Sequence, residues 1–246
     1  MKKLFNKDKS QKDKKPKRMK KSKVEDNNEY DVDQLILNDQ ESDEEKEFIS
    51  FFNEVLKKLP KKISTIILKT FDSSKAQAEK IMANSKEQYE NVFDEFLVGV
   101  DQAIKKKCYS TIHAATLTAA IIGCSPIPFS DALLLVPVQL IMMGRLHKIF
   151  GQSWSENLGS ALSKELIVVG LGRSAVGNLL KLVPVVGTVA GAAVNGAVAS
   201  TITGALGWVT VKMLNDGEDI FDNVMSFKGQ FNTLFKILQN SNKNKK

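Results

Sequence analysis

The segment 166–180, LIVVGLGRSAVGNLL, comes close to a nucleotide-binding motif. Gly170, Gly172 and Ala175 satisfy the pattern G-x-G-x-x-[G/A] behind an apolar run that could form a strand. A dinucleotide-binding fold also needs an acidic residue about 20 positions further on, where it holds the ribose. No Asp or Glu occurs between Glu165 and Asp216, so this chemistry is not favoured.

The same segment imitates two other sites and lacks an essential part of each. Gly172 and Gly177 have the glycine spacing of a phosphate-binding loop, which requires Lys and Ser/Thr after the second glycine. Asn178 and Leu179 stand there instead. Ser174 lies near the place of a nucleophile elbow, but that motif is G-x-S-x-G and the spacing here is one residue longer. We therefore expect no nucleotide hydrolysis and no catalytic residues.

Cysteine and histidine are scarce throughout the chain. The inventory of Cys and His is Cys108, Cys124, His113 and His147, without the paired spacing of a zinc site. We expect free thiols, no metal and no cofactor. His113 follows Tyr109 by one helical turn in an apolar stretch, which is more typical of a hydrogen-bonded core histidine than of a general base.

The N-terminal residues divide into two blocks of opposite charge. Residues 1–24 carry twelve Lys or Arg against two Asp, and residues 25–47 carry eleven Asp or Glu against one Lys. Apolar residues are sparse, so we expect residues 1–47 to form a disordered charged tail. Phe5 and Tyr30 are its aromatic residues, which does not favour nucleic acid as a partner. No signal-peptide pattern occurs in the first residues, which predicts a cytosolic start.

Residues 48–107 have the periodicity of amphipathic helices. Phe48, Phe52 and Val55 belong to an apolar stripe at helical spacing that stops at Pro60, and further stripes follow over 63–71 and 81–104. Such stripes usually face a protein core, although a membrane-surface role for residues 48–71 stays open.

Residues 108–240 are predicted to form an apolar helical domain, and 241–246 a frayed polar end. Between Lys107 and Arg145 the one charged side chain is Asp131, which follows two prolines and is suited to cap the next helix. Two helices in a hairpin result, and Pro137, about two turns into the second, should bend it.

The second apolar region has no charge between Lys181 and Lys212, which is long enough to cross a bilayer. Its small residues fall on two opposite helical faces. Gly187, Gly191 and Asn195 lie on one, and Gly196, Ser200, Gly204 and Gly207 on the other. Small residues allow close approach of neighbouring helices. We therefore predict that Gly191 and Gly204 are both packing positions.

A family resemblance is carried by a corner motif S-P-I-P-x-x-D at 125–131 and by residues spread over both apolar regions. The matching residues are Ser125, Pro126, Ile127, Pro128, Asp131, Gln139, Phe150, Gly151, Pro184, Gly187, Asn195, Thr203 and Gly207. Together they resemble an uncharacterised bacterial family of YcjF-like membrane proteins, whose domain also occurs fused behind Era-like GTPase domains. The resemblance implies an all-helical, membrane-linked domain that acts with GTPases and has no assigned reaction.

The expected fold is all-α, a helical bundle with two apolar Gly/Ala-rich helical hairpin regions. We expect a non-enzymatic module at the cytoplasmic membrane with both termini on the cytosolic side, acting as scaffold or effector for a GTPase in trans, and possible homo-oligomer formation. The alternative is a soluble cytoplasmic bundle that dimerises or binds a partner, because a buried helix and a membrane helix are equally apolar.

Overall fold

The computed structural model describes residues 42–127, 132–154 and 190–241, and within these ranges every regular element is helical. The all-α class predicted from the residue pattern is confirmed for this part of the chain. The predicted tail over 1–41 and the frayed end over 242–246 lie outside the described residues. The helices in chain order are α1 (Asp43–Lys58), α2 (Lys61–Lys69), α3 (Phe71–Phe96), α4 (Gln102–Cys124), the 3-10 helix η2 (Ala132–Leu135), α5 (Val136–Ile149), α8 (Ala190–Asn215) and α9 (Val224–Ser241).

Helix α1 begins earlier than the apolar stripe alone predicted. The side chain of Ser42 accepts a hydrogen bond from the backbone N–H of Glu45 at 3.2 Å, and three acidic residues occupy the first turn. A serine cap and early negative charge both stabilise a helix N-terminus. The predicted tail boundary at residue 47 therefore falls inside α1, and the residues around Glu45 and Glu47 belong to the folded bundle.

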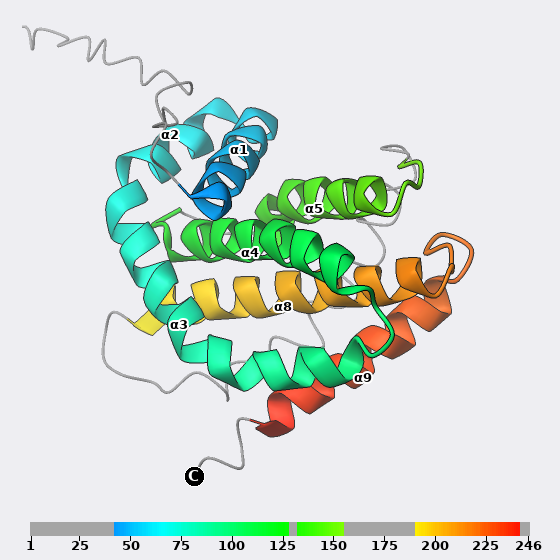
Figure 1. Cartoon of the computed structure of the whole chain (residues 1–246). Coiled ribbons are helices and arrows are strands. Elements are labelled where there is room, and N and C mark those ends of the chain that lie inside the picture. The colour runs from blue at the N-terminus through cyan, green and yellow to red at the C-terminus, as the bar shows by residue number, and fades with distance from the viewer. Residues whose placement is uncertain (1–41, 128–131, 155–189, 242–246) are drawn as a thin grey trace, which may run out of the picture.

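Two apolar helices, α4 and α8, form the centre of the bundle. They lie side by side in Figure 1, with α1 and α5 on one side of α4, α3 crossing both helices, and α9 against α8. From Cys108 to Cys124, α4 is buried almost all round, as is α8 from Ile202 to Val211. A helix that is apolar on every face must be covered by protein or lipid on every face. In this bundle the neighbouring helices cover α4 and α8.

Glycines set the distance between α4 and α8. A Cβ atom placed on Gly123 would lie 2.8 Å from backbone atoms of Asn195 and Gly196. At the other end of the crossing, a Cβ on Gly207 would lie 2.8 Å from Ile112. Gly204 is less crowded, with Thr116 at 3.2 Å from such an atom. The small-residue face that includes Gly196, Gly204 and Gly207 therefore packs on α4, as predicted.

The opposite small-residue face of α8 does not pack in the predicted way. Gly191 is exposed, and a Cβ placed there would meet no atom of the described residues within 4 Å. Asn195 is exposed as well, although its backbone touches α4. The prediction that Gly191 is a packing position is wrong, because this residue lies in the first turn of α8, beyond the crossing. Gly187 lies outside the described residues.

Pro137 does not bend a helix. It occupies the first turn of α5, and η2 precedes it with 3-10 geometry. Proline is tolerated in the first turn because its missing N–H would have no intrahelical acceptor there. The prediction of a proline two turns inside the helix is wrong, because the α-helical hydrogen bonds begin at Val136 rather than after Asp131.

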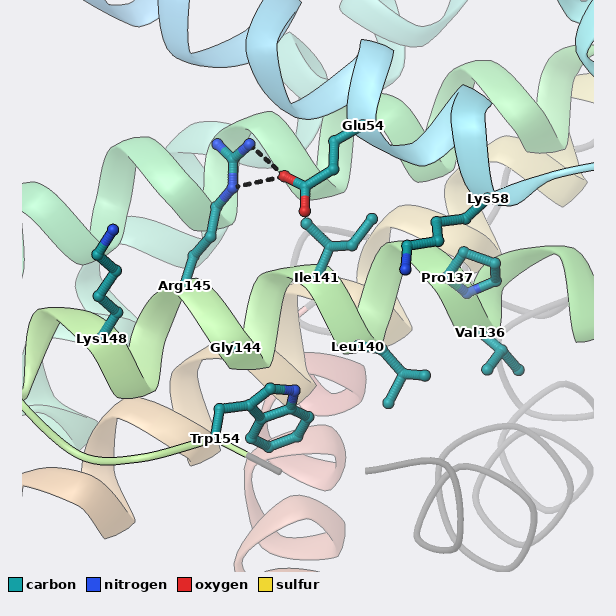
Figure 2. Close-up of a pocket in the computed structure, with 10 residues that line it drawn as sticks. All are labelled: Glu54, Lys58, Val136, Pro137, Leu140, Ile141, Gly144, Arg145, Lys148 and Trp154. Carbon is teal, nitrogen blue, oxygen red and sulfur yellow. Dashed lines mark hydrogen bonds and ion pairs between the residues drawn. The ribbon is translucent and has the colours of Figure 1, made fainter. Parts of the chain in front are cut away.

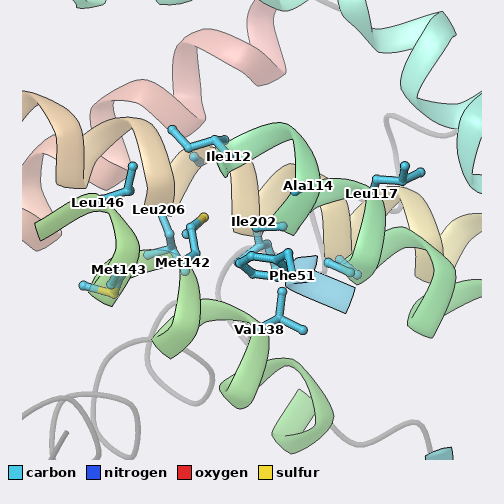
Figure 3. Close-up of a cluster of buried hydrophobic side chains, with 14 of the residues drawn as sticks. Phe51, Ile112, Ala114, Leu117, Val138, Met142, Met143, Leu146, Ile202 and Leu206 are labelled. Atoms are coloured by element: carbon cyan, nitrogen blue, oxygen red, sulfur yellow. The ribbon is translucent and has the colours of Figure 1, made fainter. Parts of the chain in front are cut away.

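The apolar core extends from the central pair to α1 and α5. Figure 3 shows Phe51 of α1 among residues of α4, α5 and α8. Phe51, Met142 and Leu206 are each fully buried. The amphipathic stripe that begins at Phe48 therefore faces the core of the bundle, and α1 holds the inner face of α5 in place. The opposite, outer face of α5 carries half-buried side chains and the exposed Lys148, and one edge of it borders α1.

Candidate functional site

The residues that carried the family resemblance do not converge on one site. Pro128, Asp131, Pro184 and Gly187 lie outside the described residues. The others are spread along the bundle: Ser125 and Pro126 follow α4, Gln139 is in α5, Gly151 follows α5, and Asn195, Gly204 and Gly207 are in α8. Most of these positions have local structural roles.

Ser125 ends α4 and ties it to α3. Its hydroxyl donates to the carbonyl of Ile121 at 2.8 Å and lies 3.4 Å from the hydroxyl of Ser74, and its backbone N–H also bonds to Ile121. Gly151 has a φ of +69° directly after α5, a conformation that glycine adopts without strain. Both residues end a helix, which explains their place among the residues of the resemblance without catalytic chemistry.

Gln139 and Thr203 are buried polar residues in the core. Gln139 is 1% exposed and Thr203 is fully buried. Neither the Oε1 atom of Gln139 nor the Oγ1 atom of Thr203 has a hydrogen-bond partner within the described part of the chain. Unpaired buried polar atoms are uncommon in folded proteins and are often satisfied by an ordered water.

Arg145 forms an ionic cluster that joins α5 to α1. Its Nη1 atom lies 2.8 Å from Oε1 of Glu47, and its Nη2 atom lies 2.6 Å from Oε2 of Glu54. The guanidinium also lies 5.1 Å from the ring centre of Phe51, and Thr111 of α4 donates to Glu47 at 3.3 Å. Burial alone would lower the pKa of Arg145, but the hydrogen bonds to the two carboxylates raise it. The cluster therefore holds a charged guanidinium between two helices.

A groove runs along the outer face of α5 beside this cluster and has a cavity volume of about 480 Å³. In Figure 2, Glu54 and Lys58 reach from α1 on one side of α5, while Trp154 lies on the other side, next to Gly144. The floor is apolar and the rim carries the charges. The lining residues are Glu54, Lys58, Val136, Pro137, Leu140, Ile141, Gly144, Arg145, Lys148 and Trp154.

Trp154 is held in place by aromatic contacts and by a glycine. Its ring centre is 4.7 Å from that of His147 and 5.6 Å from that of Phe221. A Cβ atom on Gly144 would lie 3.0 Å from the indole, so a larger residue there would crowd the ring. The half-buried indole thus forms a fixed edge of the groove.

Sequence reasoning missed this groove, although one signal was available. Arg145 ends an apolar stretch in which Asp131 is the one charged side chain after Lys107. Glu47, Ser50 and Glu54 recur at helical spacing on one face of α1, and all three contact Arg145. Two glutamates on one face of an amphipathic helix can pair with a cation on a neighbouring helix. The pairing itself depends on tertiary structure.

Replacing Arg145 with alanine should lower the free energy of unfolding by roughly 1–3 kcal/mol, between the values typical of exposed and buried ion pairs. The loss leaves Glu47 and Glu54 facing each other without a cation. Lys148→Ala, one turn further along the same rim, is the matched control and should change stability by less than about 0.5 kcal/mol. Denaturant unfolding of both variants measures the difference, and equal stability would contradict the structural role of the cluster.

His147 is buried and has a pKa below its ordinary value of 6.5. Burial is the largest cause, and it outweighs a hydrogen bond with the Met143 carbonyl, 2.7 Å from Nδ1, and the attraction of Asp219. The unfolded chain protonates His147 more readily than the folded protein does. The contribution of the neutral histidine to the free energy of unfolding is therefore fully present above pH 6.5 and is lost as the pH falls below that value. The melting temperature of the parent should therefore fall more steeply below pH 6.5 than that of His147→Gln. Parallel slopes would contradict this assignment.

The cysteines are poor nucleophiles in this fold. Both are buried and free, and burial raises the pKa of Cys108 to about 12 and that of Cys124 to about 11. A thiol must ionise to attack or to bind a metal. Across residues 42–127, 132–154 and 190–241, no group of three His, Cys, Asp or Glu side chains could hold a metal ion.

These observations define an all-helical domain in which an apolar central pair is enclosed by other helices and a charged groove lies outside. A family model described as a domain of unknown function, DUF697, matches residues 88–239, and the chain belongs to this family. It is also similar to magnetosome membrane protein 22 of Magnetospirillum gryphiswaldense, with 32% identity over 110 residues. That match covers 43% of this chain and 56% of the relative, so the chain spans about half of the relative's length. No solved structure matches the chain.

Proposed function

We propose that this chain is a non-enzymatic helical module that resides at the cytoplasmic membrane and binds a protein partner there. The observation that carries the membrane assignment is the similarity to a protein named for a membrane. We further propose that both termini lie on the cytosolic side, and the Lys and Arg residues near them support this. Arg145, His147 and the two cysteines, the groups best able to do chemistry in the described bundle, are occupied by packing or ion pairing.

Helix α8 constrains how the module meets the membrane. In the described part of the chain, the stretch Gly191–Asn215 alone is long and apolar enough to cross a bilayer. Of its most apolar window, 78% is buried inside the protein. Within the described residues α4 is therefore not a candidate span, and α8 is largely enclosed by protein. In our proposal α8 stays in the core, and the bundle docks on the membrane as a folded unit.

The same burial favours a second candidate function, a soluble helical bundle that dimerises or binds a partner. In that case the apolarity of α4 and α8 is explained by the core alone. The two candidates differ in where the native protein is found in the cell, and both treat the chain as a binding module. Self-association through the outer surface is compatible with either one.

A GTPase is the partner class that we propose. Its support is the resemblance to YcjF-like proteins, whose domain is fused behind Era-like GTPase domains in other chains. Such fusion indicates association by analogy and not by physical argument. The absence of Lys and Ser/Thr after Gly177 supports a division of labour, in which the partner hydrolyses the nucleotide and this chain positions or regulates it.

Affinity capture from cell extract tests this partner assignment. The full chain and a variant lacking residues 1–41 should both retain a GTP-binding protein, since we place the interface on the helical body. The cut lies before Ser42 because removing residues 1–47 would delete the α1 cap and Glu47, which pairs with Arg145. The purified chain alone should hydrolyse no GTP. Steady GTP turnover by the isolated chain, or capture that requires residues 1–41, would overturn the assignment.

A further inference from the structure

We propose that the groove between α1 and α5 binds one anionic lipid, with an acyl chain on the apolar surface of α5 and the headgroup at the lysines of the rim. This inference deepens the proposed membrane association and rests on it for its biological setting. The binding itself is a property of the groove and can be measured separately.

The shape and lining of the groove favour a small amphipathic ligand. Its cavity of about 480 Å³ lies within the range of small-molecule sites, ~300–1,000 Å³. Val136, Leu140 and Ile141 are half-buried side chains on its floor, and the indole of Trp154 closes one edge. Tryptophan is enriched where proteins meet the membrane–water interface. An acyl chain would cover this floor and remove its apolar surface from water.

The charges of the groove select the sign of the ligand. Lys58, Arg145 and Lys148 contribute three cations to the lining, and Glu54 is its one carboxylate. Arg145 contacts Glu47 and Glu54, and Lys58 and Lys148 are exposed to solvent. In Figure 2 their ammonium groups lie along the same side of α5 as Arg145, while Leu140, Val136 and Trp154 lie on the other. A ligand that is anionic along one edge and apolar along the other matches this division.

Trp154 allows the occupant to be observed directly. The chain has two tryptophans, and the other, Trp208, is 3% exposed in the core. In a Trp208→Phe background, the fluorescence of Trp154 should be quenched by lipid with brominated acyl chains. The full chain would be purified in uncharged detergent micelles that contain brominated phosphatidylglycerol or brominated phosphatidylcholine. Half-maximal quenching should need about tenfold less of the anionic lipid, or better, because each nearby Lys strengthens anion attraction.

Charge-reversed variants separate the groove from general attraction to negative charge. Lys58→Glu with Lys148→Glu should abolish the preference for phosphatidylglycerol. Lys106→Glu with Lys107→Glu changes the net charge equally on exposed residues of α4 and should preserve it. On the apolar side, Leu140→Glu should reduce quenching by either lipid, whereas Val98→Glu, at a residue 73% exposed elsewhere, should not. Calorimetric titration of the parent chain with phosphatidylglycerol keeps the test valid if a variant misfolds.

Two controls distinguish a lipid headgroup from free phosphate and separate the groove inference from the membrane assignment. Inorganic phosphate should leave the quenching unchanged, since it has no chain to cover the floor. If the anionic lipid binds but the native protein is found in the cytosol, the groove inference stands and the membrane assignment fails. If the protein is membrane-bound in cells but Trp154 is quenched equally by the two lipids, or the Lys58 and Lys148 variant retains the preference, the groove inference is overturned.

Discussion

Replacing Gly123 with leucine is expected to prevent stable folding. A single Cβ atom at this position would already lie 2.8 Å from the backbone of Asn195 and Gly196, and backbone cannot rotate away as a flexible side chain can. The two central helices would have to separate, which would open the core on both sides of the crossing. Overpacking usually costs ~1–3 kcal/mol, and we expect the upper end of this range or more because the contact is with backbone. Protein yield and thermal melting by circular dichroism measure the effect.

Gly191→Leu is the matched control for this experiment. Gly191 is exposed in the first turn of α8, and a Cβ atom placed on it would meet no described residue within 4 Å. Its leucine variant should therefore accumulate and melt like the parent. Gly123→Ala is a milder test of the same contact, because it adds a single methyl group. Glycine to alanine in a helix ordinarily stabilises by about 1 kcal/mol, whereas here it should destabilise. Normal melting of the Gly123 variants would show that α4 and α8 do not approach each other as described.

Much of the helical architecture could be predicted because it follows from local patterns. The stripe that includes Phe48 and Phe52 identifies a helix and the face it buries. Likewise the glycines at 196, 204 and 207 recur on one side of α8, and that side meets α4. In both cases the residues repeat with the period of an α-helix and therefore share one face, so their spacing predicts which face packs against the bundle.

The predictions for Gly191 and Pro137 were wrong because the local residue pattern does not determine where helices cross or where an α-helix begins. Gly191 and Gly204 have the same residue type, but only the latter lies within the crossing of α4 and α8, and the position of a crossing depends on partners far away in the chain. Similarly, the onset of α5 at Val136 depends on where 3-10 hydrogen bonds give way to α-helical ones. Hydrophobic spacing does not distinguish these two patterns over a single turn.

The groove could not be predicted because its parts are distant in sequence. Arg145 and Glu47 are separated by 98 residues, and Trp154 reaches the outer face of α5 through a turn that begins at Gly151. Those residues of the family resemblance that the structure describes, by contrast, lie mainly at helix ends and helix crossings. They report how the bundle is built, and the surface chemistry is supplied by other residues.

Membrane retention at native expression is the most direct test of the central claim. Cells would be lysed without detergent, and the membrane fraction washed in about 1 M salt, where electrostatic attraction is screened beyond ~3 Å. We predict that nearly all of the chain stays with the membranes, because apolar contact with lipid does not weaken in salt, and that uncharged detergent then releases it. Recovery of the native protein in the soluble fraction as a monodisperse species without detergent would contradict the account and would establish the soluble bundle instead.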